Sequence, residues 1–139
     1  MTESESIPPN SILIENSVLS CCLQDKALFF KLLSEGVTKD YFFDGLCQAV
    51  FLSLKELADE EGAFDIILVV HSCQSIINEE EFDKIDGEVA SRVMKLRSVS
   101  GVTQSFDKYA SELKQIHWQR QAFFHAADIL SGKNPPTTD

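Results

Sequence analysis

The sequence predicts an all-α fold, in which a compact helical bundle is followed by one long C-terminal helix. Apolar residues recur at helical spacing through most of the 139 residues, and the connections between these periodic segments are short. Only residues 66–70 favour a strand by local propensity, and no second strand is predicted that could satisfy their backbone groups. We therefore expect this run to belong to a buried helix that begins after an N-cap at Asp65 and continues through Ile77.

Two helices are expected before the first aromatic turn. Residues 1–9 form a polar lead-in that ends in two prolines, so we expect them to be flexible. Either Asn10 or Ser11 can cap the first helix, and Asp25 can cap the second. Gly36 suits the left-handed conformation that ends a helix. The apolar residues of these two helices are Ile14, Val18, Leu19, Cys22, Leu23, Leu28, Phe29, Leu32 and Leu33.

A third helix follows the aromatic turn at residues 41–43. Asp44 can provide its N-cap, and the acidic segment 58–62, which ends in glycine, closes it. Its apolar face consists of Leu46, Val50, Phe51, Leu54 and Leu57. Beyond the helix that follows Asp65, residues 79–81 are expected to form the first turn of a separate short helix, because negative charge is favourable at a helix N-terminus.

The C-terminal part of the chain is expected to hold the longest helix. Residues 88–97 are expected to be helical, and a loop at 98–101 leads to a helix at about 104–130. This segment contains no glycine or proline, and residues 131–136 stop it. A heptad seam, with members at steps of four and three residues, consists of Tyr109, Leu113, Ile116, Arg120, Phe123, Ala127 and Leu130.

One small domain cannot cover the whole of this helix. A helix of about 27 residues is about 40 Å long, and a bundle formed by residues 10–97 can cover only one end of it. Each apolar seam residue gains about 1.5–3 kcal/mol when it is buried, so we expect another molecule or segment to pack on the distal half. We expect residues 98–131 to serve association and residues 132–139 to form a flexible tail.

The expected partner-binding residues are six members of the seam and one neighbour. An unpaired charge buried in the seam would be costly, so Arg120 is expected at its rim or against a carboxylate of a partner. The seven residues are Tyr109, Leu113, Ile116, Arg120, Phe123, Phe124 and Leu130.

The charge of the chain disfavours nucleic acid as a direct partner. The net charge is −10, and residues 1–91 carry 18 acidic and 5 basic side chains whereas residues 92–139 carry 4 acidic and 7 basic ones. Affinity for DNA comes mainly from lysine and arginine, so strong direct binding is not expected. The asymmetry indicates either two differently solvated faces, or a C-terminal element that meets an acidic surface such as that of a neighbouring copy. No apolar run is long enough for a membrane span, and no signal peptide is recognisable, so a cytoplasmic location is expected.

The sequence offers no constellation typical of catalysis, cofactor binding or metal binding. The cysteines at 21, 22, 47 and 73 lack zinc-site spacing and are expected to be reduced core residues. Ser131-Gly132-Lys133 resembles the end of a phosphate-binding loop, but Ala127 stands where that loop needs glycine and Asn134 where it needs serine or threonine. We therefore expect no enzymatic activity and no cofactor for this chain.

The ordered series of local strings resembles the N-terminal domain of the DnaB-type replicative DNA helicases. The matching strings are PNSILIENSVL at 9–19, YFF at 41–43 with Val50-Phe51, GAFD at 62–65, Asp86-Gly87 and Tyr109-Ala110. The similarity extends over about residues 8–130. Four departures, at Ser20, Gly45, Cys47 and Leu68, indicate a divergent member.

This resemblance implies an all-α bundle followed by a helical hairpin, of which residues 104–130 would be the first arm. In the family the hairpin pairs two subunits, the domains form a collar on the hexameric ring, and the collar docks the primase or a helicase loader. A separate ATP-dependent helicase domain performs the catalysis. Two alternatives stay open: a stand-alone phage, plasmid or host adaptor of the same fold that modulates a helicase, and a small enzyme with an unrecognised active site.

Overall fold

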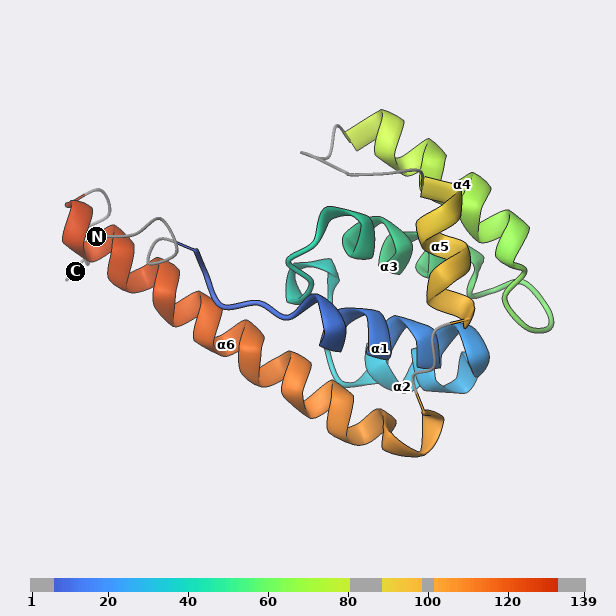
Figure 1. The fold of residues 1–139 in the computed structure, drawn as a ribbon, viewed down its shortest axis with the longest axis horizontal. Coiled ribbons are helices and arrows are strands. Elements are labelled where there is room, and N and C mark those ends of the chain that lie inside the picture. The colour runs from blue at the N-terminus through green and yellow to red at the C-terminus, as the bar shows by residue number, and fades with distance from the viewer. Residues whose placement is uncertain (1–6, 81–88, 99–101, 133–139) are drawn as a thin grey trace.

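The structure, a computed structural model, describes residues 7–80, 89–98 and 102–132. Within these ranges the chain is all-helical, as predicted, with a bundle of shorter helices and one long helix that runs past it (Figure 1). The elements are α1 (Ile12–Gln24), α2 (Lys26–Ser34), η2 (Lys39–Tyr41), α3 (Gly45–Leu57), α4 (Ile66–Glu80), α5 (Val89–Ser98), η3 (Thr103–Ser105) and α6 (Phe106–Ser131), where η denotes a short 3-10 helix.

Capping side chains set the starts of the first four α-helices. Ser11 Oγ accepts a hydrogen bond from the Ile14 amide at 3.2 Å, and Asp25 Oδ1 accepts one from the Ala27 amide at 3.1 Å. The carboxylates of Asp44 and Asp65 do the same for α3 and α4 at 3.1 and 2.9 Å. Each cap satisfies an amide that lacks a partner within its helix. The predicted caps are therefore confirmed, with Ser11 rather than Asn10 at the first helix.

Residues 66–70 are helical, as predicted, and the helix runs further than expected. The expectation that this helix is fully buried was wrong, because Ile67 and Leu68 are 64% and 47% exposed. The acidic residues Glu79 and Glu80 were predicted to open a separate helix, but they are the last two residues of α4. The prediction was wrong because Ile76 is buried and Ile77 packs against the core, so the apolar stripe carries the helix past the point where a new start was expected. The third predicted member, Glu81, lies outside the described residues.

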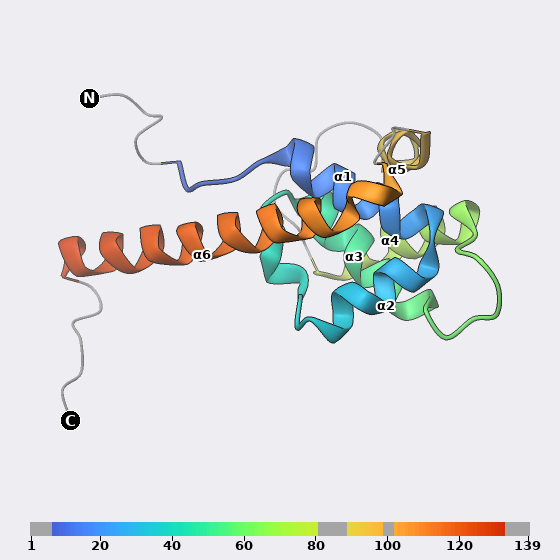
Figure 2. The ribbon, with the colours of Figure 1, turned by 90° about the horizontal axis from the view of Figure 1, so that it is seen from below.

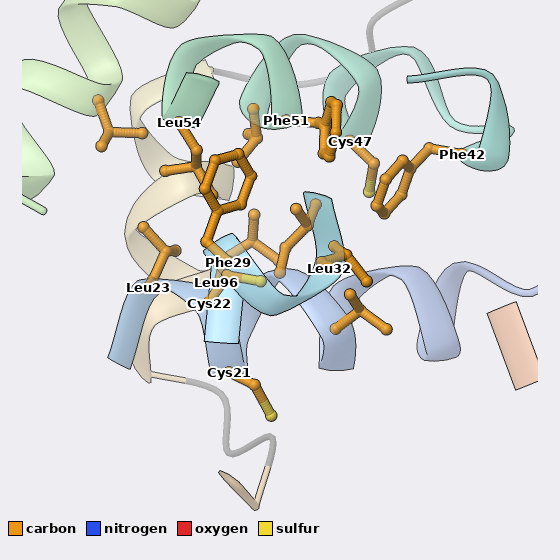
Figure 3. Close-up of a cluster of buried hydrophobic side chains, with 14 of the residues drawn as sticks. Cys21, Cys22, Leu23, Phe29, Leu32, Phe42, Cys47, Phe51, Leu54 and Leu96 are labelled. Carbon is orange, nitrogen blue, oxygen red and sulfur yellow. The ribbon is translucent and has the colours of Figure 1, made fainter. Parts of the chain in front are cut away.

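The core lies between α2, α3 and the helices that flank them. Phe29 of α2 contacts Phe51 at 5.5 Å and Phe64 at 5.7 Å between ring centroids, both edge-on. Figure 3 shows the Phe29 ring beneath α3, among buried side chains of that helix that include Phe51 and Leu54. All four cysteines are buried, as predicted. Burial raises the pKa of each of their thiols, that of Cys73 to about 11, so they are protonated and unreactive near neutral pH.

The helices pack in a series that leaves α6 on one side of the bundle. Helix α3 packs on α4, α4 on α5, α5 on α1, and α1 on α6. Seen from below, the C-terminal half of α6 extends far beyond the bundle (Figure 2). No helix within residues 7–80, 89–98 and 102–132 combines the length and the apolar character that a bilayer crossing needs.

Candidate protein-interaction surface on α6

The first half of α6 buries one stripe against α1 and η2. The stripe consists of Phe106, Ala110, Leu113, His117 and Arg120, at steps of four and three residues. It shares only Leu113 and Arg120 with the heptad seam, whose members Tyr109 and Ile116 are half-buried. The sequence pattern missed the small Ala110 and the polar His117, because it followed large apolar residues. Both sets advance by steps of four and three, so spacing alone does not distinguish this stripe from the seam.

Arg120 ends the buried stripe and ties distant segments to α6. Only 3% of it is exposed, and its guanidinium donates from Nη1 to the Pro9 carbonyl and from Nη2 to the Asp40 carbonyl, both at 3.1 Å. It also lies over the ring of Phe43, at 5.6 Å from the centroid. The expectation of a rim position or of a partner's carboxylate was therefore wrong, since two backbone carbonyls of the same chain receive this charge. Burial lowers the pKa of Arg120, while the carboxylates of Glu15 and Asp40 raise it.

Glu15 fixes the aromatic turn against which α6 packs. It is 2% exposed, and its two carboxylate oxygens accept hydrogen bonds from the amides of Phe43 at 2.8 Å and Asp44 at 3.1 Å. Burial raises the pKa of Glu15, whereas these two hydrogen bonds and the charge of Arg120 act in the opposite direction. The sequence pattern gave this glutamate no role in the site. Its place among the apolar residues of α1 was the available signal, because a buried carboxylate needs partners.

His117 stacks on the 3-10 turn. Its ring lies parallel to that of Tyr41, with centroids 3.9 Å apart and an interplanar angle of 19°. Its buried Nδ1 has no hydrogen-bond partner within the described part of the chain. Burial and the neighbouring Arg120 charge lower the pKa of His117, and the backbone and carboxylate of Asp40 oppose that shift. The imidazole is therefore favoured in its neutral form.

A cavity of about 560 Å³ opens between the aromatic turn and α6. Two exposed aromatic side chains of α6, Trp118 and Phe124, stand in its wall and are 63% and 45% exposed. The full lining is Thr38, Asp40, Phe42, Phe43, Gln48, His117, Trp118, Arg120, Gln121 and Phe124. The cavity thus lies at the point where α6 leaves the bundle.

The second half of α6, residues 121–131, contains no buried residue. We refer to it as the projecting half. It carries Phe124, Ile129, which is 46% exposed, and Leu130, which is 87% exposed. Phe123 is half-buried. The seven predicted partner-binding residues are therefore divided, with Phe123, Phe124 and Leu130 on the projecting half and the other four beside or within the bundle.

Within the described residues, the structure brings no metal-binding group together. In the ranges it describes, no three His, Cys, Asp or Glu side chains are placed to share a metal ion. The chemistry that the arrangement offers is that of a protein-binding surface, in which exposed aromatic and aliphatic side chains flank a cavity with polar groups.

Comparison with known proteins agrees with the helical architecture. The family model described as DnaB-like helicase N terminal domain matches residues 7–115. The crystal structure of the N-terminal domain of DnaB helicase from Mycobacterium tuberculosis superimposes with a TM-score of 0.73 at 18% identity, covering 90% of this chain and 86% of that one. At that identity the superposition shows a shared fold. No curated protein sequence matches the chain.

The family match ends inside α6, just before the stretch of helix that leaves the bundle. It therefore includes the caps, the buried Glu15 and most of the buried stripe, and it excludes Arg120 and the projecting half. The matched model describes the N-terminal domain of a helicase and not its ATPase domain. Because the match spans well over half of the 139 residues, the chain belongs to the family of DnaB-like helicase N-terminal domains.

Proposed function

We propose that this chain acts in DNA replication as the assembly and docking domain of a DnaB-like replicative helicase in the cytoplasm, without catalysis of its own. The observation that carries the proposal is the projecting half of α6, which leaves Phe124, Ile129 and Leu130 exposed on a helix that the bundle does not cover. Full burial of each of these side chains is worth about 1.5–3 kcal/mol. A surface of this kind is typical of an interface.

A second copy of the chain is the proposed primary partner. If two copies of α6 pack antiparallel about Phe124, residues equally far before and after it face each other. The contact face then includes Phe124 together with Gln121 and Ala127, which are exposed and lie within about 60° of Phe124 around the helix. Such a pairing is self-complementary, as a two-fold interface requires.

The seven residues named from the sequence contribute unequally to this proposal. Phe123, Phe124 and Leu130 are the proposed contact residues. Tyr109, Leu113, Ile116 and Arg120 hold α6 on the bundle and so orient the projecting half. The primase or a helicase loader is the proposed further partner of the assembled domains, by analogy with the family that the chain belongs to.

Light scattering over a concentration series tests the self-association. We expect the mass to rise above that of the 15.6 kDa monomer as concentration increases, and the double variant Phe124→Ser with Leu130→Ser to remain monomeric. The matched control is Leu13→Ser, which replaces a side chain that is 69% exposed on α1. A wild-type chain that stays monomeric at the highest concentration would contradict the proposal, as would a double variant that associates as well as the control.

Cysteine cross-linking tests the antiparallel register. The native thiols are buried and protonated, so a cysteine introduced on α6 is the reactive one. We expect Phe124→Cys to form an intermolecular disulfide readily, because a residue on the two-fold axis faces its own copy. Gln119→Cys, which is exposed but points about 140° around the helix from Phe124, is the control. Equal cross-linking of both variants in a dimeric protein would refute the register while leaving self-association intact.

A further inference from the structure

A second apolar surface lies on α4 and α5, at the end of the molecule away from the projecting half of α6 (Figures 1 and 2). Ile67 is 64% exposed, and Leu68 and Met94 are each 47% exposed. Among the described residues, these three are the large apolar side chains of α4 and α5 that are exposed. The self-association proposed for α6 does not use them.

Ile67 and Met94 line a groove of about 330 Å³ between the two helices. Its α4 wall is formed by residues 67, 70, 71 and 74, which share one helix face because they are spaced by three and four positions. They span about 10 Å, or two helical turns. Ala90 and Met94 form the α5 wall. The groove therefore has the length and the apolar lining that suit two turns of a partner helix.

An acidic hollow of about 220 Å³ lies at the start of α4, where Leu68, the residue that follows Ile67 of the groove, helps to line it. Glu60, Glu61 and Asp65 line it, and residues 56–65 carry five carboxylates and no basic side chain. Lys26 reaches the same loop, but its ammonium group donates to the backbone carbonyls of Glu60 and Gly62. Within the described part of the chain, no lysine or arginine pairs with the carboxylates of this hollow. The three carboxylates of the hollow outnumber the one Lys26 ammonium group, which lies over the Phe64 ring, so the hollow keeps a net negative charge.

We propose that this composite surface docks a basic amphipathic helix of a protein partner. The apolar side chains of that helix would enter the groove between α4 and α5, and a lysine or arginine on its flank would reach the acidic hollow. An apolar face spaced for a groove is the usual way in which a helix is recognised, and complementary charge fixes its direction. Nucleic acid does not suit a surface whose charged part is acidic.

Fluorescence anisotropy with a labelled leucine–lysine peptide tests the proposal. The peptide is helical and repeats leucine at i, i+3, i+4 and i+7, with lysine elsewhere. We expect saturable binding to the full chain that weakens as salt increases. Ile67→Ser combined with Met94→Ser should weaken it about tenfold, since both apolar anchors are lost. Glu60→Gln combined with Glu61→Gln should weaken it to a similar extent through the acidic hollow.

Three controls make the outcome specific to this face. Asp107→Asn with Glu112→Gln removes as many carboxylates elsewhere and should leave the affinity unchanged. Phe124→Ser with Leu130→Ser should also leave it unchanged, which separates this surface from the one proposed on α6. A peptide with glutamate in place of lysine should not bind. Absence of saturable binding, equal binding by the groove variants, or loss of binding only in the α6 variant would each overturn the proposal.

Discussion

Of the two halves of α6, the one with more charged side chains is the one that packs on the bundle: residues 106–120 carry five and residues 121–131 carry one. Residues 106–120 bury a stripe that includes an arginine and a histidine, whereas residues 121–131 leave a phenylalanine, an isoleucine and a leucine exposed. Polarity therefore does not decide which half is inside. What decides it is whether α1 and the aromatic turn stand opposite the helix, because a side chain is buried only when another element covers it.

Arg120 marks the boundary between the two halves. It brings the carbonyls of Pro9 and Asp40, which are remote in sequence, to the same point on α6. Glu15 holds the turn that carries Asp40 by accepting two backbone amides just beyond it. This buried polar arrangement fixes the angle at which the projecting half leaves the bundle, and so orients the surface proposed for assembly.

Matched leucine substitutions should give the largest contrast between the two halves. Leu113 is 1% exposed and Leu130 is 87% exposed. Leu113→Ala should lower the free energy of unfolding by about 2–5 kcal/mol, because it leaves a cavity in the packed half. Leu130→Ala should change it by less than about 0.5 kcal/mol. Urea unfolding followed by circular dichroism at low protein concentration measures both, and equal losses would mean that the projecting half is also packed.

Removal of the boundary charge should have the next largest effect. Arg120→Met keeps the stem of the side chain but leaves two partly buried carbonyls without this donor, so we expect a loss of about 2–3 kcal/mol in unfolding free energy. Arg120→Lys should restore little of it, because one ammonium group lacks the fork that reaches both carbonyls. Gln119→Met, at an exposed position of the same helix, is the control. A loss as large in the control would show that the effect is not specific to the hydrogen bonds.

Alanine substitution of two glycines at helix ends tests whether backbone strain at each end lowers the free energy of unfolding of the whole domain. Gly36 and Gly132 both have positive φ, of 86° and 71°, and an added Cβ would meet no atom within 4 Å at either position. Gly36→Ala should cost about 1–2 kcal/mol in unfolding free energy, because α2 is part of the packed bundle. Gly132→Ala should cost far less, since it frays only the exposed end of α6. Similar losses measured in urea would contradict the separation of the two halves.

The smallest expected effect is a pH dependence that comes from His117. Its pKa lies below the ordinary value of 6.5, so the unfolded chain takes up this proton more readily than the folded one. The stability it contributes is complete above that ordinary value and is lost as the pH falls toward its lowered pKa. We therefore expect His117→Phe to lose less stability than the wild type between about pH 7.5 and about pH 5.5. The buried Glu15 has the opposite sign but is common to both proteins.

NMR titration of the imidazole provides an independent check on this last point. The His117 ring signals should titrate with a midpoint below 6.5, as expected for a buried ring beside a guanidinium group. A midpoint above that value would show that the carboxylate of Asp40 outweighs burial and Arg120.

The sequence by itself determined the local features of this protein. Serine and aspartate before apolar runs predicted the starts of four helices. Residues 66–70 were predicted to be helical, despite their strand propensity, because no second strand was predicted that could pair with them. The family resemblance followed from an ordered series of short strings, and the family match over residues 7–115 confirmed it. The sequence also predicted that α6 is longer than the bundle can cover, because the number of helical residues and the fixed rise per residue of an α-helix give its length.

Only the tertiary structure decided which residues of α6 face inward. The seam was drawn through large apolar residues, but the buried stripe runs through Ala110, His117 and Arg120. A small residue, a stacked imidazole and a guanidinium between two carbonyls become core residues only when elements remote in sequence supply a close backbone, a ring or an acceptor at that point. Local periodicity contains no information on those partners, so it located the helix and misassigned its face.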